Sequence, residues 1–150
     1  MAAVAFAALG GCQLISQGHN AEGVRMYQQA YYEGALQQFQ RALDADPQNP
    51  DSYYNLGATH HQLAKLHKRD ADYTQAESYY NQCIDKSPNH EECYRGLAVL
   101  LVETDAFDLA KDAPGRARLK TRLDGLYEKS CGLSDSLAAS YFSHVPARVS

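Results

Sequence analysis

Basic residues are scarce in this 150-residue sequence: 14 Lys and Arg stand against 18 Asp and Glu, and the net charge is −4. Binding to nucleic-acid phosphates generally needs a basic surface that displaces counterions. The composition therefore excludes a general nucleic-acid-binding protein, and we predict no nucleic-acid partner. Long apolar runs are absent too, since no window reaches the roughly 20 apolar residues that a membrane-spanning helix needs.

The sequence also lacks the common motifs of catalytic sites. It has no glycine-rich phosphate loop, no GxSxG, no CxxC and no HExxH. We therefore predict a protein that is not an enzyme and that uses no cofactor. Disorder is not expected, because 45% of the residues are hydrophobic and the Pro and Gly residues are scattered.

The first eleven residues, MAAVAFAALGG, are uncharged and mostly apolar, and a polar stretch follows Cys12. Such a segment is typical of the end of a secretory signal peptide. The run Leu9-Gly10-Gly11-Cys12 resembles the bacterial lipobox, which implies cleavage before Cys12 and a lipid anchor on its sulfur. Gln13 follows in place of an Asp, which favours the periplasmic side of the bacterial outer membrane.

Two points qualify the signal-peptide interpretation. No Lys or Arg precedes Cys12, so we expect the true start codon to lie upstream. The alternative is that the Ala-rich N-terminal segment is a first helix that packs on the body of the protein.

A mature N-terminus with two or three acyl chains would hold a soluble domain stably at a membrane, since each buried methylene contributes about 0.8 kcal/mol.

Residue types recur at fixed intervals of 34 and 41 residues through most of the chain. At 34 residues the pairs are Gly23 with Gly57, Tyr73 with Phe107, and Ala76 with Ala110. At 41 residues the pairs are Tyr32 with Tyr73, Ala35 with Ala76, Pro47 with Pro88, and Tyr53 with Tyr94. Periods in this range are the signature of helical repeat proteins.

The two intervals differ by seven residues, so an insertion of that length lies between Gly57 and Tyr73. Seven residues make almost two turns of α-helix, which keeps the faces of a lengthened helix in phase with the stack. We therefore predict one long helix from Ser52 to about Lys68 that extends beyond its neighbours. Asp51 or Ser52 is expected to cap its N-terminus.

These residues and spacings resemble the tetratricopeptide repeat (TPR) family, in which each unit is a pair of antiparallel helices. Gly23 and Gly57 occupy the position at which a small residue lets the two helices approach. Phe39 and Tyr80 occupy the aromatic position that fills the gap to the next unit. The resemblance implies an all-α TPR helix-turn-helix solenoid with two good repeats and one degenerate repeat.

The third repeat departs from the pattern. Its second helix is expected to contain Phe107 and Ala110, but Pro114 stands where an aromatic residue belongs. After this break, a helix from Arg116 to Ser130 is expected to cap the stack through an apolar stripe of Leu119, Leu123, Leu126 and Tyr127. The predicted organisation is a signal peptide over 1–11, a tether over 12–18, a TPR domain with its capping helix over 19–130, and a short tail over 131–150.

The resemblance further implies a concave groove lined by the first helix of each hairpin. The groove positions fall on Asn20, Val24, Tyr27, Gln28, Tyr54, Ala58, His61, Gln62, Arg95, Val99 and Glu103. Such a surface, rich in aromatic and amide groups, suits an extended peptide or a partner helix. The chaperone-type subclass clamps a C-terminal carboxylate with Lys, Arg and Asn, and only Asn20 and Arg95 match, which argues against that ligand. The alternative role of Tyr27 and Tyr54 is interhelical packing.

Cysteine and histidine residues suggest two further features. Cys83 and Cys93 lie ten residues apart across the Pro88 turn, so they can form a disulfide in an oxidising compartment. Alternatively, Cys83 simply fills the small position that Ala42 fills in the first repeat.

The expected tip of the long helix carries a basic cluster of His60, His61, Lys65, His67, Lys68 and Arg69. We predict no metal site there, because the His60 to His67 spacing exceeds the i, i+4 pair of helical zinc sites. Either solvation, or docking of an acidic partner or an anionic headgroup, explains the cluster.

Together these features indicate a non-enzymatic protein-interaction module. The lipobox and the repeats indicate a TPR lipoprotein on the periplasmic side of the outer membrane, bound to the membrane through Cys12 and to a protein or peptide through its groove. Similar short TPR lipoproteins act as pilotins, as pilus assembly factors or in envelope assembly. The alternative is a soluble cytosolic TPR scaffold or co-chaperone.

Overall fold

The computed structural model describes residues 3–109 and 113–130, and within these the side chains of residues 11–104 and 121–129. The described residues form six helices and contain no strand. The helices are α1 Ala3–Gln28, α2 Tyr32–Ala45, α3 Pro50–His67, α4 Asp70–Lys86, α5 Glu91–Leu109 and α6 Ala113–Ser130.

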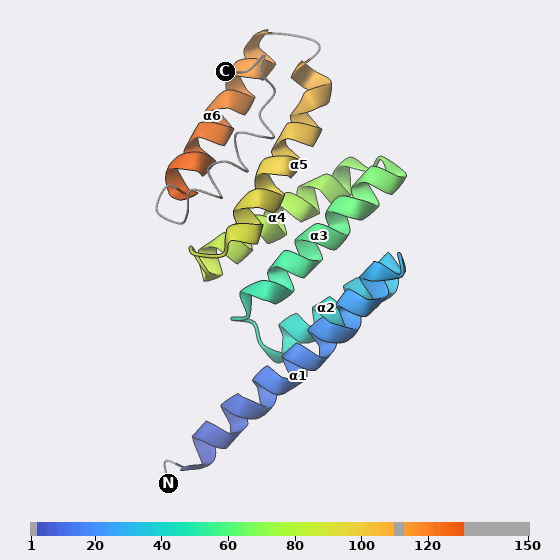
Figure 1. Cartoon of the computed structure of the whole chain (residues 1–150), viewed down its shortest axis with the longest axis vertical. Helices are drawn as coiled ribbons and strands as arrows, with labels where there is room; N and C mark the ends of the chain where they lie inside the picture. Colours follow the sequence, from blue (N-terminus) through green and yellow to red (C-terminus); the bar gives the residue numbers. More distant parts are fainter. Residues whose placement is uncertain (1–2, 110–112, 131–150) are drawn as a thin grey trace.

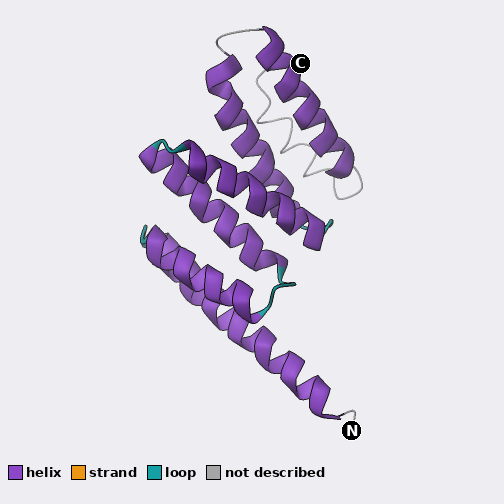
Figure 2. Ribbon diagram, turned by 180° about the vertical axis from the view of Figure 1, so that it is seen from behind, coloured by secondary structure: helices purple, strands orange, loops and turns teal. Residues whose placement is uncertain are grey.

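The six helices form three antiparallel hairpins, α1–α2, α3–α4 and α5–α6, stacked one on another (Figure 1). The view from behind shows the same stack, with the N-terminal end of α1 extending past the rest (Figure 2). The first helices of successive hairpins also touch, α1 with α3 and α3 with α5. The fold is therefore an all-α TPR solenoid, as the repeat spacing predicts.

In each of the first two repeats the aromatic side chain packs against the glycine of its own hairpin, a contact that the repeat pattern did not predict. A Cβ atom added at Gly23 would lie 2.4 Å from the ring of Phe39, which is buried. One added at Gly57 would lie 3.0 Å from the ring of Tyr80, and one at Gly96 only 2.6 Å from it. The Tyr80 ring thus fills the space between the second and third hairpins, and it leaves less room for a Cβ at Gly96 than at Gly57.

The seven inserted residues lengthen both helices of the second hairpin. The prediction of one long helix is confirmed, since α3 continues ten residues past Gly57 whereas α1 ends five residues past Gly23. The second helix also gains length, because α4 begins three residues before Tyr73 whereas α2 begins at Tyr32. The connection between α3 and α4 is one residue shorter than the connection between α1 and α2. It begins with Lys68, which has a left-handed φ of 52°.

The N-terminus of α3 is capped by a residue that the sequence analysis did not choose. The side chain of Asn49 accepts a hydrogen bond of 3.0 Å from the backbone N–H of Asp51, and Pro50 opens the helix. The prediction of Asp51 or Ser52 as the cap is therefore wrong. Proline suits the first helical position, because its fixed φ fits the helix and its missing N–H has no partner there. Ser52 is instead buried against α1.

The third hairpin differs from its prediction in the position of its turn. Phe107 lies in α5, not in the second helix of the repeat, and α5 runs without a break to Leu109. The 91–109 segment holds no Gly or Pro after Gly96, so no residue stops the helix there. The partner helix α6 starts at Ala113, with Pro114 in its first turn. It covers the end of the stack through the buried side chains of Leu123 and Leu126, as the capping prediction requires.

The N-terminal segment is helical. Residues 12–18, predicted as a tether, lie within α1, where Cys12 is exposed and Ser16 is buried. Asn49 donates a hydrogen bond of 3.3 Å to the Ser16 hydroxyl, so this part of α1 packs on the turn before α3. None of the described helices is both long enough and apolar enough to cross a membrane. The predicted tail over 131–150 lies outside the described residues.

Candidate functional site

A pocket of about 260 Å³ lies on the face formed by the first helices of the hairpins. Most of its walls come from α3 and α5, with Tyr27 from α1 and Tyr80 from α4. Seven of the eleven residues predicted for the groove line it: Tyr27, Tyr54, Ala58, His61, Gln62, Arg95 and Val99. The pocket therefore brings together seven of the positions that the repeat register assigns to the groove.

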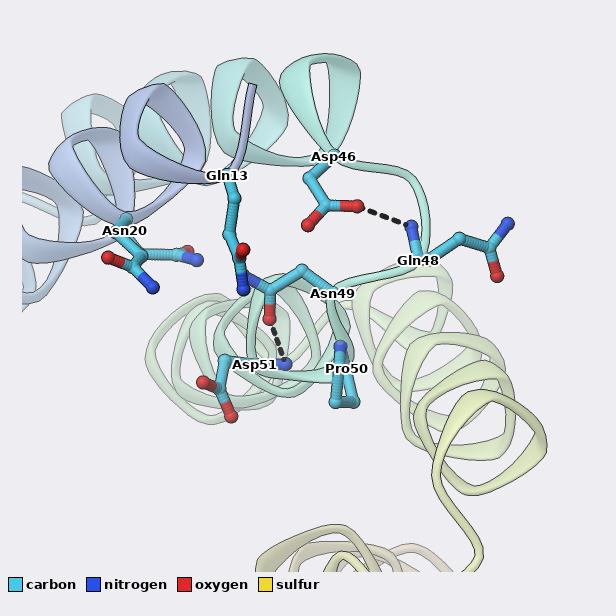
Figure 3. Close-up of a pocket in the computed structure, with 8 residues that line it drawn as sticks. Gln13, Asn20, Asp46, Gln48, Asn49, Pro50 and Asp51 are labelled. Carbon is cyan, nitrogen blue, oxygen red and sulfur yellow. Dashed lines mark hydrogen bonds between the residues drawn. The ribbon is translucent and has the colours of Figure 1, made fainter. Parts of the chain in front are cut away.

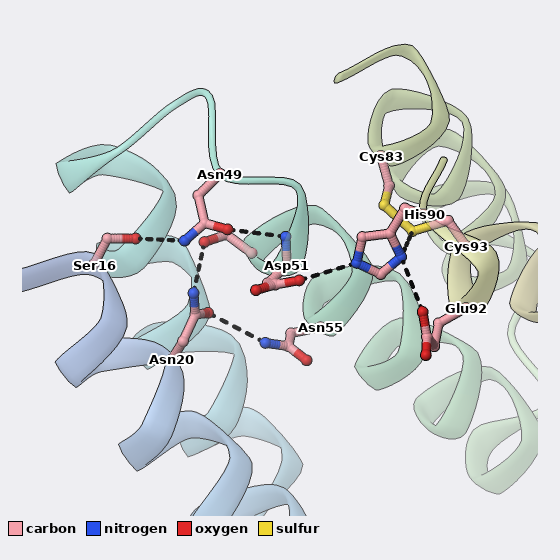
Figure 4. A network of polar contacts seen from close by, with 10 residues as sticks. Ser16, Asn20, Asn49, Asp51, Asn55, Cys83, His90, Glu92 and Cys93 are labelled. Atoms are coloured by element: carbon pink, nitrogen blue, oxygen red, sulfur yellow. Dashed lines mark hydrogen bonds and ion pairs between the residues drawn. A yellow bond between two sulfur atoms is a disulfide. The ribbon is translucent and has the colours of Figure 1, made fainter. Parts of the chain in front are cut away.

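The other four predicted residues lie outside the pocket wall. Val24 and Gln28 are exposed on α1, and Glu103 lies beside the pocket, where it contacts His61. Asn20 is buried and lines a different pocket, described below. Its amide donates to the Ser52 hydroxyl at 3.0 Å and accepts from Asn55 at 3.2 Å, so it joins α1 to α3 (Figure 4).

Four further residues line the pocket but were not predicted for it: Lys65, Tyr80, Glu92 and Gly96. Three of them lie three residues away from predicted positions on the same helix: Lys65 from Gln62, Glu92 from Arg95 and Gly96 from Val99. Residues at that spacing are neighbours on a helix surface. Extending each predicted position by one turn would have found them. Tyr80 was predicted only to pack between repeats.

Tyrosine rings form the base of the pocket. Tyr80 is buried, and its ring centre lies 6.1 Å from that of Tyr54. Burial raises the pKa of Tyr80, Tyr54 and Tyr27 above the ordinary value, and a hydrogen bond to Gln62 opposes the shift at Tyr27. The phenols therefore stay neutral at physiological pH, where a hydroxyl both donates and accepts hydrogen bonds.

The charged groups in and beside the pocket differ in how they contact other side chains. Glu103 accepts a hydrogen bond from His61 at 2.8 Å and holds the ammonium of Lys65 at 3.5 Å. Glu92 lies 3.5 Å from the ring of His90. Arg95 is exposed at the pocket wall. Its guanidinium offers planar, paired donors that match a carboxylate.

His61 makes the stability of the protein depend on pH. Burial against the Tyr73 and Tyr80 rings lowers its pKa, and the hydrogen bond to Glu103 only partly opposes this. The unfolded chain therefore binds a proton at a higher pH than the folded chain does. We expect the contribution of neutral His61 to be complete above about pH 6.5 and to be lost as the pH falls through the lower folded pKa.

This expectation is tested by urea unfolding at a series of pH values. In His61→Gln, whose amide still offers a donor to Glu103, the free energy of unfolding should fall less between pH 7.5 and pH 5 than in the wild type. The exposed His67→Gln variant, from the end of the same helix, should keep the wild-type slope. Equal slopes in all three proteins would contradict the assignment to His61.

A second pocket, of about 440 Å³, lies where α1 meets the turn between α2 and α3. Figure 3 shows its polar lining, most of which comes from residues 46–51, in the turn and at the start of α3. The Asp46 carboxylate accepts from the Gln48 N–H at 3.1 Å, and Asn49 accepts from Asp51 as described above. These groups close the turn and cap α3, so their arrangement is explained by the fold.

The basic cluster at the far end of the second hairpin is largely neutralised by acidic residues from other helices. Asp72 contacts His60 at 3.1 Å and Arg69 at 2.7 Å, and Glu103 engages His61 and Lys65. Asp72 is itself buried. A cationic surface for an acidic partner is therefore smaller than the sequence suggests.

Comparisons with known proteins agree with this architecture. Residues 23–63 match a family model described as TPR repeat, and residues 58–90 match a model described as tetratricopeptide repeat. No curated protein matches the chain. The fold is similar to the TPR2B domain of yeast Sti1 in its pHsp70 complex, with a TM-score of 0.63 and 18% identity over 87% of this chain and 96% of that one.

A second solved structure shares the fold to a similar extent. It is the first TPR of Spaghetti (RPAP3) bound to the HSP90 peptide SRMEEVD, with a TM-score of 0.62 and 17% identity over 92% of this chain and 96% of that one. The TPR resemblance of the sequence is thereby confirmed for the repeats and for the fold.

Proposed function

We propose that this protein is a non-enzymatic protein-interaction module that binds an extended peptide or a partner helix in the pocket between α1, α3 and α5. The observation that carries the proposal is the pocket itself, in which tyrosine rings form the base and the Arg95 guanidinium is exposed on the wall. Aromatic and Arg side chains are the residues that contribute most at protein interfaces. Of the two structures with a similar fold, one is a complex with pHsp70 and the other is bound to an HSP90 peptide, which supports the same use of this fold.

The arrangement favours an internal segment of a partner over a C-terminal carboxylate. Two residues match a carboxylate clamp. The side chain of Asn20 already forms hydrogen bonds with Ser52 and Asn55, so only Arg95 is available to a ligand. One exposed guanidinium can pair with a single acidic side chain. We therefore infer a ligand with one acidic residue flanked by apolar or aromatic side chains, which pack on Tyr27 and Tyr54.

The proposal is tested by replacing Tyr54 with Ala and Arg95 with Glu in one variant and capturing partners from an envelope extract. A partner bound by the wild type should bind the variant at least about tenfold more weakly, a loss of about 1.4 kcal/mol. The matched control carries Leu66→Ala and Arg41→Glu, which truncate one exposed apolar side chain and reverse one charge away from the pocket. Circular dichroism checks that both variants are folded.

The binding constant of the captured partner is then measured by titration calorimetry with the purified proteins. Undiminished binding to the pocket variant would overturn the role of this surface, and equal weakening of both variants would show that binding does not depend on the pocket.

We further propose that the module acts as a lipoprotein on the periplasmic side of the outer membrane, as an adaptor or an assembly factor such as those of pili. The lipobox-like run before Cys12 and the exposure of that residue on α1 support this address. Labelling with radioactive palmitate should mark the wild type and not Cys12→Ala. An unlabelled protein in the cytosol would instead favour the alternative, a scaffold or co-chaperone, which the pHsp70 and HSP90 peptide complexes of the two solved relatives also suggest.

A further inference from the structure

Three side chains with metal-binding atoms meet at the turn between α4 and α5, away from the peptide pocket. Cys83 lies near the end of α4, His90 lies in the turn, and Cys93 lies in the first part of α5. Their sulfur and nitrogen atoms all lie within 4.8 Å of one another. Cys83 and Cys93 form a disulfide, and His90 Nδ1 lies 3.3 Å from Cys93 Sγ (Figure 4).

A disulfide alone does not call for a histidine, yet His90 is held in a definite orientation. Its Nε2 lies 2.9 Å from the Asp51 carboxylate of α3, which leaves Nδ1 pointing toward the two sulfur atoms. A histidine whose second ring nitrogen is bonded to a carboxylate is the usual arrangement at zinc sites, where the carboxylate fixes the ring and raises its basicity. The His90 side chain is only 13% exposed, and both cysteines are fully buried.

Backbone hydrogen bonds within the turn also link the segments that carry the three ligands. The N–H of Ser87 donates to the carbonyl of Cys83 at 2.8 Å, that of His90 to Ser87 at 3.0 Å, and that of Cys93 to His90 at 3.1 Å. Two residues separate His90 from Cys93, the spacing at which paired zinc ligands commonly occur. The donor set of two thiolates and one imidazole is the set that zinc prefers.

We propose that reduction converts this disulfide into a zinc site held by Cys83, His90 and Cys93. A dithiol reductant gives two electrons and two protons, so that the S–S bond breaks, two thiols form and the reductant itself becomes a disulfide. Zn²⁺ then replaces both thiol protons, which leave to solvent, and takes the lone pair of His90 Nδ1. Glu92, whose carboxylate lies 3.5 Å from Nδ1, or a water molecule supplies the fourth ligand.

The site would exchange one cross-link of the α4–α5 turn for another. In the oxidised state the two sulfur atoms are bonded to each other. In the reduced, metal-loaded state both sulfur atoms bind zinc, and the imidazole binds it as well. Either state fixes the second hairpin to the third, which is where Glu92 and Arg95 enter the peptide pocket. These ligands share no residue with the His60 and His67 pair that the sequence analysis rejected.

The test uses Co²⁺ as a spectroscopic probe on the full chain with Cys12→Ser and Cys131→Ser, so that only the paired cysteines are left. The protein is reduced with dithiothreitol, freed of reductant under anaerobic conditions and titrated. We expect thiolate-to-cobalt charge-transfer absorption and tetrahedral visible bands that saturate at one Co²⁺ per chain and are displaced by Zn²⁺. The oxidised protein should show neither.

Two substitutions test the histidine and its orientation. His90→Gln should weaken Co²⁺ binding at least about tenfold, and Asp51→Asn should weaken it by about 10–100-fold, because the carboxylate acts through the ring. His67→Gln, which removes a distant histidine, should bind as the parent does. Binding of unchanged strength in His90→Gln would overturn the proposed ligand set.

Circular dichroism keeps the test decisive if reduction loosens the fold. A reduced chain that stays helical but shows no more thiolate absorption than the Cys83→Ser, Cys93→Ser variant would overturn the site. So would a reduced chain that loses helicity and does not regain it on addition of Zn²⁺. A Zn²⁺-dependent rise in the melting temperature of the reduced parent, absent from the double variant, is the supporting result.

Discussion

Truncation of Phe39 to alanine is expected to lower the free energy of unfolding by about 3–5 kcal/mol. The Phe39 side chain is 1% exposed, and its ring lies directly over Gly23, where α2 meets α1. Removing the ring leaves a cavity between two helices whose backbones are already close, so the site cannot collapse fully. Urea unfolding followed by circular dichroism measures the change, with an unchanged m-value confirming that the same transition is observed.

The matched control for this truncation is Leu66→Ala, because Leu66 is 60% exposed near the end of α3. A surface substitution of this kind should change stability by no more than about 0.5 kcal/mol in either direction. A loss of less than about 1 kcal/mol in Phe39→Ala would contradict the packing described for the first hairpin.

The contact of each aromatic ring with the glycine of its own hairpin was not predicted. The positions of Gly23, Phe39, Gly57 and Tyr80 in the first two repeats were predictable, because repeat spacing fixes which residues share a helix face. The third hairpin was not, because Phe107 falls at the expected interval from Tyr73 while nothing near it stops a helix. A shared residue type at the right spacing predicts a position in the fold only where a breaker also sets the turn.

Seven of the eleven residues predicted for the groove line one pocket, but the side-chain contacts of Asn20 and Glu103 were not predictable. The register of α3 and α5 placed Tyr54, His61 and Arg95 on one surface, which follows from helix geometry alone. Asn20 forms a hydrogen bond with Ser52, and Glu103 forms an ion pair with Lys65. Each of these contacts joins side chains from different helices. Their partners lie 32 and 38 residues away in the chain, so local spacing could not reveal them.

The Cys83–Cys93 pair illustrates the same limit of sequence reasoning. Its spacing allowed either a disulfide or two separate small packing residues, and the structure shows the disulfide. The orientation of the nearby His90 depends on Asp51, which belongs to the preceding hairpin, so local spacing does not reveal it. The chemistry of this turn therefore depends on residues from two stacked repeats, and no single repeat contains all of them.

Two glycines of the same helix are expected to respond to alanine with opposite signs. Gly23→Ala should destabilise the protein, because the new methyl group would lie 2.4 Å from the buried Phe39 ring. Overpacking of this kind costs about 1–3 kcal/mol, which outweighs the roughly 0.5–1 kcal/mol gained by removing glycine from a helix interior. Gly18→Ala, where a Cβ meets nothing within 4 Å, should keep that gain and stabilise the protein.

The sign difference separates close packing from helix propensity, since propensity alone stabilises both variants. A second substitution identifies the atoms responsible: Phe39→Leu replaces the ring that the new methyl group meets with a smaller aliphatic side chain. The double variant Gly23→Ala, Phe39→Leu should therefore be more stable than the sum of the two single changes predicts, by about 0.5–3 kcal/mol in a double-mutant cycle. Additive effects, or a stabilising Gly23→Ala, would show that α1 and α2 do not meet at this contact.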